Sequence, residues 1–152
     1  MKPDIAFIQP DSENFPWDLF LLADPSRSMI ESYLPEAEIA IYRLKDKIIG
    51  GYIINYRSEE KVELMNIAIY DAYQKQGYGS QLLVYLIQRL KSKLVKELQL
   101  GTGTFGHQLT FYHRHGFRVH RLEKNYFLEK YEEKIIENGI RHRDRLWLVL
   151  EL

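Results

Sequence analysis

The chain contains 152 residues, of which 45% are hydrophobic and 28% charged, as in one ordinary globular domain. It has no cysteine, which excludes disulfide scaffolds, cysteine-based zinc sites and thiol nucleophiles. The 21 basic and 21 acidic side chains cancel, which argues against a bulk binder of nucleic acid or membranes. The longest apolar runs, 19–23 and 146–150, fall far short of the roughly 20 residues of a membrane span. With no secretory signal at its start, we expect a single cytoplasmic domain over residues 1–152.

The charge is nevertheless divided unevenly along the chain. Residues 1–60 hold 6 basic and 11 acidic side chains, whereas residues 61–152 hold 15 basic and 10 acidic ones. Such a difference also arises as ordinary variation within one globule. If it has a function, a basic second half suits an anionic ligand and an acidic first half a cationic one.

In chain order, the first half predicts one strand, two short helices and three further strands. The first strand covers residues 5–9, and helices follow after Pro16 and after a capping Ser26. These helices are expected at 17–23 and 27–34. Strands rich in β-branched and aromatic residues follow at 38–44, 48–57 and 61–70. Short polar connections between these three strands imply antiparallel neighbours.

The second half opens with the strongest helix signal, at residues 77–96, where leucines recur every four residues from Leu82 to Leu94. The remaining elements are expected as a strand at 97–100, a glycine-rich turn at 101–106, a helix at 107–115, a strand at 117–122, a helix at 129–137 and a closing strand at 145–151. This order predicts a mixed α/β fold, with a mostly antiparallel central sheet and flanking helices around one core.

Two glycine-rich loops are candidates for binding a phosphate. The first, at residues 74–80, joins a strand to the longest helix, where unpaired N–H groups and the positive helix end favour an anion. A plain strand-to-helix turn is the alternative. The second loop, at residues 101–106, matches G-x-G-x-x-G, with Glu123 beyond it as in dinucleotide-binding folds. The short helix after it and the 100 residues before it weigh against that interpretation.

Three motifs between residues 63 and 117 resemble the GNAT superfamily of N-acetyltransferases. The stretch 66–69, Asn-Ile-Ala-Ile, is similar to the bulged strand of that family. The stretch 74–79 matches its Q/R-x-x-G-x-G/A acetyl-CoA signature, and 111–117 looks like its end motif. Each motif alone is weak, but all three occur in the family's order and spacing. The resemblance therefore implies the GNAT fold, with acetyl-CoA in a cleft between splayed central strands.

The resemblance also implies how individual residues contact acetyl-CoA. Backbone amides of the first glycine loop would hold the pyrophosphate, those of Lys75, Gln76, Gly77, Tyr78, Gly79 and Ser80. The bulged strand would pair its backbone with the pantetheine arm through Ile67, Ala68 and Ile69, as an added strand would. Thr104 stands near the position where relatives often place an asparagine beside CoA, so we expect its hydroxyl to substitute there.

Two side chains are similar in position to catalytic residues of the family. Tyr112 matches the tyrosine that protonates the departing thiolate, and a phenol with a pKa of about 10 is protonated at neutral pH. Glu63 is similar in position to the glutamate base of histone-type members; a water chain is the alternative base. The alternative interpretation is that Tyr112 is only a core tyrosine and that Glu63 is only a solvated strand residue.

The expected activity is therefore transfer of an acetyl group from acetyl-CoA to a primary amine of a small molecule or peptide, by direct attack in a ternary complex. No metal is expected, because the five histidines lack ligand spacing. Family members are often dimers, which makes a homodimer the partner to test. The tail, with Asn138-Gly139, looks like a small bacterial subgroup, some members of which are labelled indole-acetate acetyltransferases. The alternatives are a CoA-binding sensor without turnover and an oxidoreductase that uses the loop at 101–106.

Overall fold

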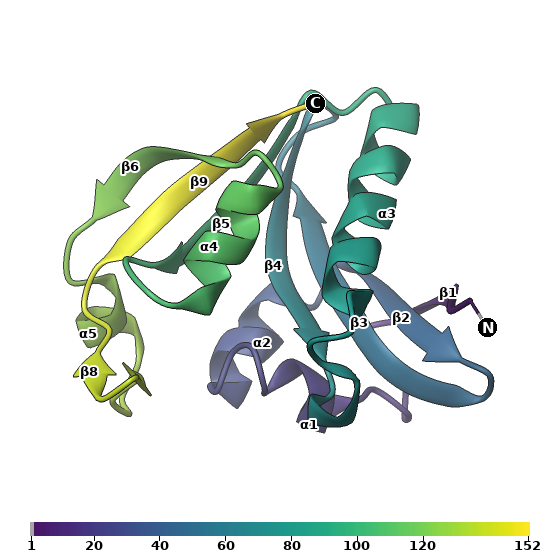
Figure 1. Ribbon diagram of the computed structural model, residues 1–152, viewed down its shortest axis with the longest axis horizontal. Coiled ribbons are helices and arrows are strands. Elements are labelled where there is room, and N and C mark those ends of the chain that lie inside the picture. The colour runs from purple at the N-terminus through teal and green to yellow at the C-terminus, as the bar shows by residue number, and fades with distance from the viewer. Residues whose placement is uncertain (1) are drawn as a thin grey trace. The chain divides into compact units, whose positions relative to one another are not determined.

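The computed structural model describes residues 2–152, which form two compact units (Figure 1). The first unit ends at Lys96 and the second runs from Glu97 to Leu152. Each unit has its own antiparallel strands with helices packed on them. None of the helices among residues 2–152 is both long enough and apolar enough to cross a membrane.

Four antiparallel strands lie side by side in the first unit, in the order β1-β2-β3-β4. They are β1 (Asp4–Ile8), β2 (Glu38–Leu44), β3 (Lys47–Tyr56) and β4 (Lys61–Ile69). These bounds agree with the predicted strands to within one residue at each end. The agreement is close because polar hairpin tips separate strands that are rich in β-branched and aromatic residues.

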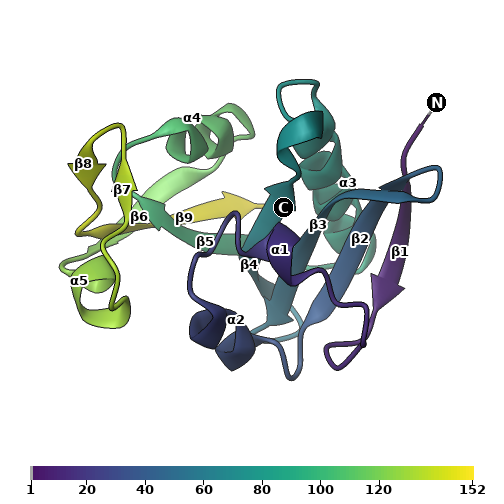
Figure 2. The same cartoon turned by 90° about the horizontal axis from the view of Figure 1, so that it is seen from below.

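Helices cover both faces of this first sheet (Figures 1 and 2). The short helices α1 (Trp17–Phe20) and α2 (Arg27–Tyr33) pack on one face, and α3 (Tyr78–Ser92) packs on the other. A one-turn 3-10 helix, η1 (Asp71–Tyr73), follows β4. The prediction for α3 was too long at its C-terminal end, because Leu94 takes a left-handed φ of 63° that no α-helix continues through.

Alternation along β2 and β3 separates the two faces of the sheet. Ile39, Ile41 and Ile53 are buried in the core beneath α1 and α2. Residues of the opposite parity contact α3: the Tyr42 hydroxyl donates to Gln81 at 3.0 Å. Buried leucines complete that second layer from the helix side; they are Leu82, Leu83, Leu86 and Leu90. The four-residue spacing in the sequence therefore identified the buried face of α3 correctly.

The second unit has three antiparallel strands in the order β5-β9-β6, with one main helix. Its elements are β5 (Glu97–Gly103), α4 (His107–Arg114), β6 (Arg118–Glu123), α5 (Tyr126–Lys130), β7 (Ile136–Glu137), β8 (Ile140–Arg141) and β9 (Arg145–Glu151). Helix α4 packs on β5. The core of this unit includes Leu98, Leu100, Phe117 and Leu148, each at most 1% exposed.

The prediction of a helix at 129–137 is wrong. The helix α5 begins earlier and ends at Lys130, and residues 136–141 form a small β-hairpin, β7–β8. Asn138 and Gly139 have φ values of 55° and 76°, which are the left-handed values that a two-residue hairpin turn requires. The Asn-Gly pair is thus a hairpin turn instead of a helix stop. The predicted turn at 101–106 also begins too early, since β5 continues to Gly103.

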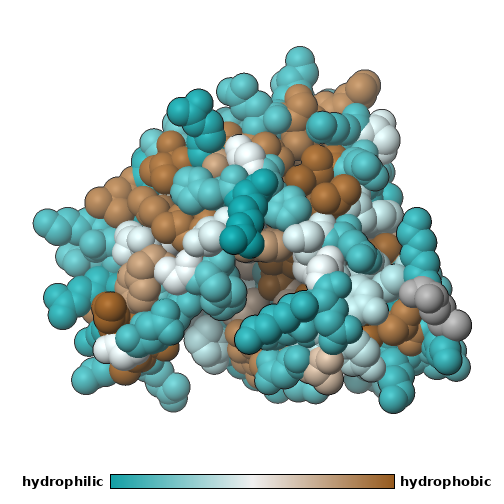
Figure 3. Space-filling view, viewed as in Figure 1, coloured by the Kyte–Doolittle hydropathy of each residue, from teal (hydrophilic) through white to brown (hydrophobic). Residues whose placement is uncertain are grey.

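Polar and apolar residues intermingle on the face of the molecule that Figure 3 shows. The exposed large apolar side chains include Val119 and Leu122 of β6 and Ile136 and Ile140 of the β7–β8 hairpin. Apolar atoms supply roughly 55–60% of the surface of an ordinary folded protein. Scattered exposure of this kind therefore does not identify a binding surface.

Candidate active site

The middle of β4 contains a β-bulge. In the pairing of β3 with β4, Ile53 lies opposite Asn66 but Ile54 lies opposite Leu64, so that Met65 is the extra residue. A bulge bends its strand and turns backbone groups away from the regular ladder. The three residues predicted to pair with pantetheine, Ile67, Ala68 and Ile69, begin two residues after Met65. The bulged strand that the family resemblance implied is therefore present, and it lies where the motif predicts it.

The loop after η1 leads into α3 with an unusual backbone. Lys75 has a φ of 61° and Gly77 a φ of 87°, and glycine adopts such values without strain. Gly77 is the residue before the first turn of α3, and no side chain caps this helix end. The first N–H groups of a helix have no intrahelical partners, so this end of α3 offers amide donors and a positive dipole to an anion.

Side chains of the loop bind the chain itself and so hold the loop in shape. Gln74 Nε2 donates to the Ile69 carbonyl at 2.9 Å and to Asp71 Oδ1 at 3.1 Å. Gln76 Nε2 donates to the Ala72 carbonyl at 3.1 Å. The glutamine that begins the motif therefore acts as a brace between the end of β4 and the loop.

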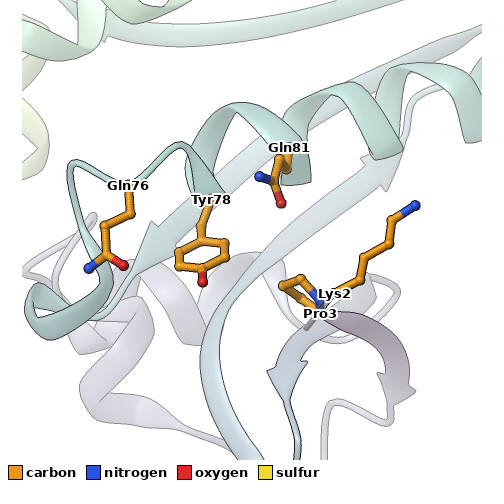
Figure 4. A pocket seen from close by; sticks show the side chains of 5 residues that line it. All are labelled: Lys2, Pro3, Gln76, Tyr78 and Gln81. Atoms are coloured by element: carbon orange, nitrogen blue, oxygen red, sulfur yellow. The ribbon is translucent and has the colours of Figure 1, made fainter.

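An open pocket of about 460 Å³ lies beside the first turn of α3 (Figure 4). Its lining residues are Lys2, Pro3, Gln76, Tyr78 and Gln81. The Tyr78 ring stands between those of Tyr42 and Tyr73, with centroids 6.4 Å away from each. This aromatic packing fixes the first residue of α3, and with it the direction in which the helix start points.

Glu63 is 7% exposed on β4, which is far from the solvated strand position that was the alternative. Arg57 Nε and Nη2 both donate to its Oε1, at 2.9 and 2.7 Å. Arg57 Nη2 also lies 3.6 Å from the sulfur of the bulged Met65. The Glu63 carboxylate is thus held in one orientation near the bulge, with one oxygen committed to Arg57.

Tyr112 is buried in the second unit, on α4, with 6% of its surface exposed. Its ring lies edge-on against Phe111 and Phe117, with centroids 5.3 and 5.6 Å away. Burial raises the pKa of the Tyr112 hydroxyl above the ordinary value of 10. A phenol in this environment keeps its proton at neutral pH, as a general acid must. The predicted ligand Thr104 is exposed, one residue beyond the end of β5.

The glycines of the second loop are explained by packing within the second unit. A Cβ on Gly103 would clash with the ring of His142, and a Cβ on Gly106 would clash with the carboxylate of Glu137. Phe105 stacks on the His142 ring at 4.0 Å. These glycines therefore make room for side chains of the tail, which is a physical reason for the G-x-G-x-x-G match other than a dinucleotide.

The sequence did not reveal three residues that stabilise these positions. Arg57 pairs with Glu63 across a hairpin, Glu137 bonds to His107 and His142 at 3.1 and 2.9 Å, and His142 is 6% exposed. His142 is a loop residue that the fold buries. The sequence offers only charges of opposite sign at these positions. Such charges do not show which side chains form an ion pair in the folded chain.

Comparison with known proteins identifies the class to which this chain belongs. A family model described as "Acetyltransferase (GNAT) domain" matches residues 35–119. The chain is 37% identical over 137 residues to the uncharacterized N-acetyltransferase YvbK of Bacillus subtilis (strain 168), covering 90% of this chain and 88% of that one. The chain therefore belongs to the GNAT family of N-acetyltransferases.

Two solved structures are similar over nearly their whole length. One is a GNAT family acetyltransferase from Elizabethkingia anophelis with acetyl-CoA bound, at 38% identity and a TM-score of 0.93, with 99% of each chain covered. The other is the IAA acetyltransferase from Bacillus cereus ATCC 14579, at 35% identity and a TM-score of 0.90, covering 99% of this chain and 100% of that one. The predicted mixed α/β GNAT fold is thereby confirmed.

Proposed function

We propose that this acetyltransferase moves the acetyl group of acetyl-CoA to a primary amine of a small molecule or peptide, by direct attack in a ternary complex. The observation that carries the proposal is the uncapped start of α3 behind a loop with left-handed Lys75 and Gly77. This arrangement suits the pyrophosphate of CoA. The similar Elizabethkingia anophelis protein has acetyl-CoA bound, which supports the same cosubstrate here.

Contacts to acetyl-CoA would come from backbone groups of both motifs. The amides of residues 75–80 hold the pyrophosphate, and the backbone of residues 67–69 pairs with the amide-bearing pantetheine arm as an added strand does. Thr104, which follows β5, contributes its hydroxyl. Backbone N–H groups near the bulge at Met65 polarise the thioester carbonyl. We further propose that residues 1–152 act as one N-acetyltransferase domain, as the 99% coverage of both chains in that comparison suggests.

Two side chains would move the protons. Glu63 accepts one from the attacking amine, directly or through a water, and Oε2 is the atom that we assign because both Arg57 donors contact Oε1. Tyr112 donates one to the departing thiolate. With no cysteine in the chain, no thiol can carry the acetyl group, so a single displacement is expected. Without a basic amine, indole acetate offers no nucleophile for this step.

Thermal unfolding with acetyl-CoA tests the proposal. At 100 times Kd, acetyl-CoA should add about 2.7 kcal/mol to the free energy of unfolding, or roughly 5–11 °C for a chain of this size. NAD(P) serves as the control and should produce no shift, because packing accounts for the glycines at 101–106. A shift with NAD(P) alone, or none with millimolar acetyl-CoA, would contradict the proposal.

Thiol release during an amine screen then separates an enzyme from a CoA-binding sensor. An active transferase releases CoA in the presence of some amine, whereas a sensor binds acetyl-CoA and never does. Sedimentation of the same samples measures whether the protein is a homodimer.

A further inference from the structure

Buried polar side chains connect α1, α2 and β4 within the first unit. Asn66 is 4% exposed and follows the bulged Met65 directly. Its Nδ2 donates to the Phe20 carbonyl at 2.9 Å and contacts the Tyr33 hydroxyl at 3.2 Å. That hydroxyl donates to Asp24 Oδ2 at 3.0 Å. A single amide group therefore joins the last residue of α1 and the last residue of α2 to the same point of β4.

Burial of this amide has an energetic cost that its contacts must offset. Oδ1 of Asn66 is buried and has no hydrogen-bond partner among residues 2–152. Leaving such an acceptor unpaired lowers the stability of the folded chain. An apolar side chain would avoid this cost in a core that contains Leu19, Ile30 and Ile53. It could not, however, tie two helix ends to the strand, and this connection is what the amide provides.

The connection is made at the bulge, where the course of the backbone matters most. The bulge at Met65 sets the direction of the backbone that leads into residues 67–69. We infer that Asn66 is a positioning residue of the acetyl transfer, which holds the bulge in the conformation that presents this backbone to acetyl-CoA. The inference rests on the proposed function. Misplacement of a reacting group by about 1 Å can lower the rate 100-fold.

Asn55 provides a matched control on the neighbouring strand. Its Nδ2 donates to the Tyr33 carbonyl at 3.1 Å, and its Oδ1 is likewise buried with no partner in the described part of the chain. It thus resembles Asn66 in chemistry and touches the same tyrosine. It lies opposite Glu63, one position beyond the Ile54–Leu64 pair that flanks the bulge.

The experiment compares wild type, Asn66→Ala and Asn55→Ala well below their unfolding temperatures. For Asn66→Ala we expect kcat to fall about 10–100-fold. The Kd for CoA should rise far less than kcat falls, because the amides at 74–80 that hold the pyrophosphate are untouched, although the pantetheine contacts at 67–69 lie on the affected strand. Asn55→Ala also removes a buried amide, so it should lose comparable thermal stability; because it leaves the contacts of Asn66 in place, kcat should stay within about 3-fold. This split between kcat and Kd is what a purely structural role would not produce.

Equal losses of kcat in the two variants, or an unchanged kcat in Asn66→Ala, would overturn the inference. If Asn66→Ala does not fold, Tyr33→Phe tests the inference in its place. This variant removes the hydroxyl that Asn66 contacts and keeps the hydrogen bond from Asn66 to the Phe20 carbonyl. A lower kcat at unchanged CoA affinity then supports the inference, and an unchanged kcat overturns it. The activity of the wild-type protein separates the two failures. An inactive wild type contradicts both the proposed function and this inference, whereas with an active wild type the variants test the inference alone.

Discussion

At the scale of single residues, the environment of a side chain indicates which protonation state it holds. Tyr112 is enclosed by apolar rings, and burial raises the pKa of its hydroxyl. Tyr70 shows the same direction for partly different reasons: burial, and then a hydrogen bond to Asp18, raise its pKa to about 12. Both phenols therefore remain protonated at neutral pH. Only Tyr112 lies in the family's end motif, which makes it the candidate acid.

Replacing Tyr112 with phenylalanine tests the acid directly. We expect Tyr112→Phe to lower kcat about 100-fold, since general acid catalysis contributes typically 10²–10⁴-fold. Affinity for CoA should not change, because the loop at 74–80 is intact. Steady-state thiol release and calorimetry with CoA measure the two quantities. Because its pKa is raised, Tyr112 should stay protonated in the wild type, so deprotonation of this hydroxyl should cause no loss of activity below about pH 10. Full activity in Tyr112→Phe would show that the hydroxyl is not the acid.

Glu63 is the second test at this scale. Glu63→Gln keeps the size of the side chain and removes its capacity to accept a proton. If the carboxylate is the base, kcat should fall about 100-fold. The same measurement on Arg57→Lys is the control, because it keeps the positive charge and changes the hydrogen-bonding geometry at Oε1. A Glu63→Gln variant with unchanged kcat would assign the proton to a water.

At the scale of elements, the start of α4 is held by a residue from the β7–β8 hairpin. The N-terminus of α4 follows Gly106 and has no cap of its own. Glu137 Oε2 accepts from the backbone N–H of His107 at 3.3 Å and from its ring at 3.1 Å. The other oxygen binds His142 at 2.9 Å. A carboxylate at a helix N-terminus is stabilising, so a distant hairpin caps the helix that carries Tyr112.

This cap predicts a pH-dependent contribution to stability. Burial alone would raise the pKa of Glu137, but hydrogen bonds from His142 and His107 outweigh it and lower the pKa below its usual value. A lowered folded-state pKa means that the contribution is present above the unfolded value, about 4.3, and is lost as pH falls through the folded value.

We therefore expect Glu137→Gln to lower the free energy of unfolding by about 1 kcal/mol at pH 7. The difference from wild type should shrink steadily below about pH 4. Urea unfolding at pH 7 and below about pH 4 measures this difference in the free energy of unfolding. Glu133→Gln is the control, because Glu133 is exposed and lies nearby in the sequence. A difference that grew in acid, or that matched the control at pH 7, would show that Glu137 does not act as the cap.

At the scale of the whole molecule, the uneven charge agrees with the proposed chemistry. The basic side chains exceed the acidic ones after residue 60, and the acidic ones exceed the basic ones before it. The proposed pyrophosphate loop lies in the basic part, which suits a polyanionic cosubstrate. Because surface charge mainly affects the rate of encounter, this agreement supports the proposal without identifying the amine.

Local pattern was sufficient for most of the secondary structure and for the family. Strands such as β2 and β9 were predicted at their observed bounds, because alternation and polar tips act between near neighbours. The motifs at 74–79 and 111–117 located the candidate loop and Tyr112. The roles of these residues stay predictions. The segment at 129–137 was mistaken because an Asn-Gly pair can end a helix or turn a hairpin, and nearby residues do not decide between them.

Local pattern could not predict hydrogen-bond partners that are distant in the sequence. Asn66 meets Phe20 and Tyr33 from 46 and 33 residues away, and Glu137 reaches His107 from 30. Hydrogen bonds and burial depend on where the chain returns in space, and no spacing rule encodes that. The sequence therefore determined the class of enzyme and its candidate residues. Only the folded chain decided that Glu63 is paired with Arg57, that Tyr112 and His142 are buried, and that the bulge is tied to two helix ends.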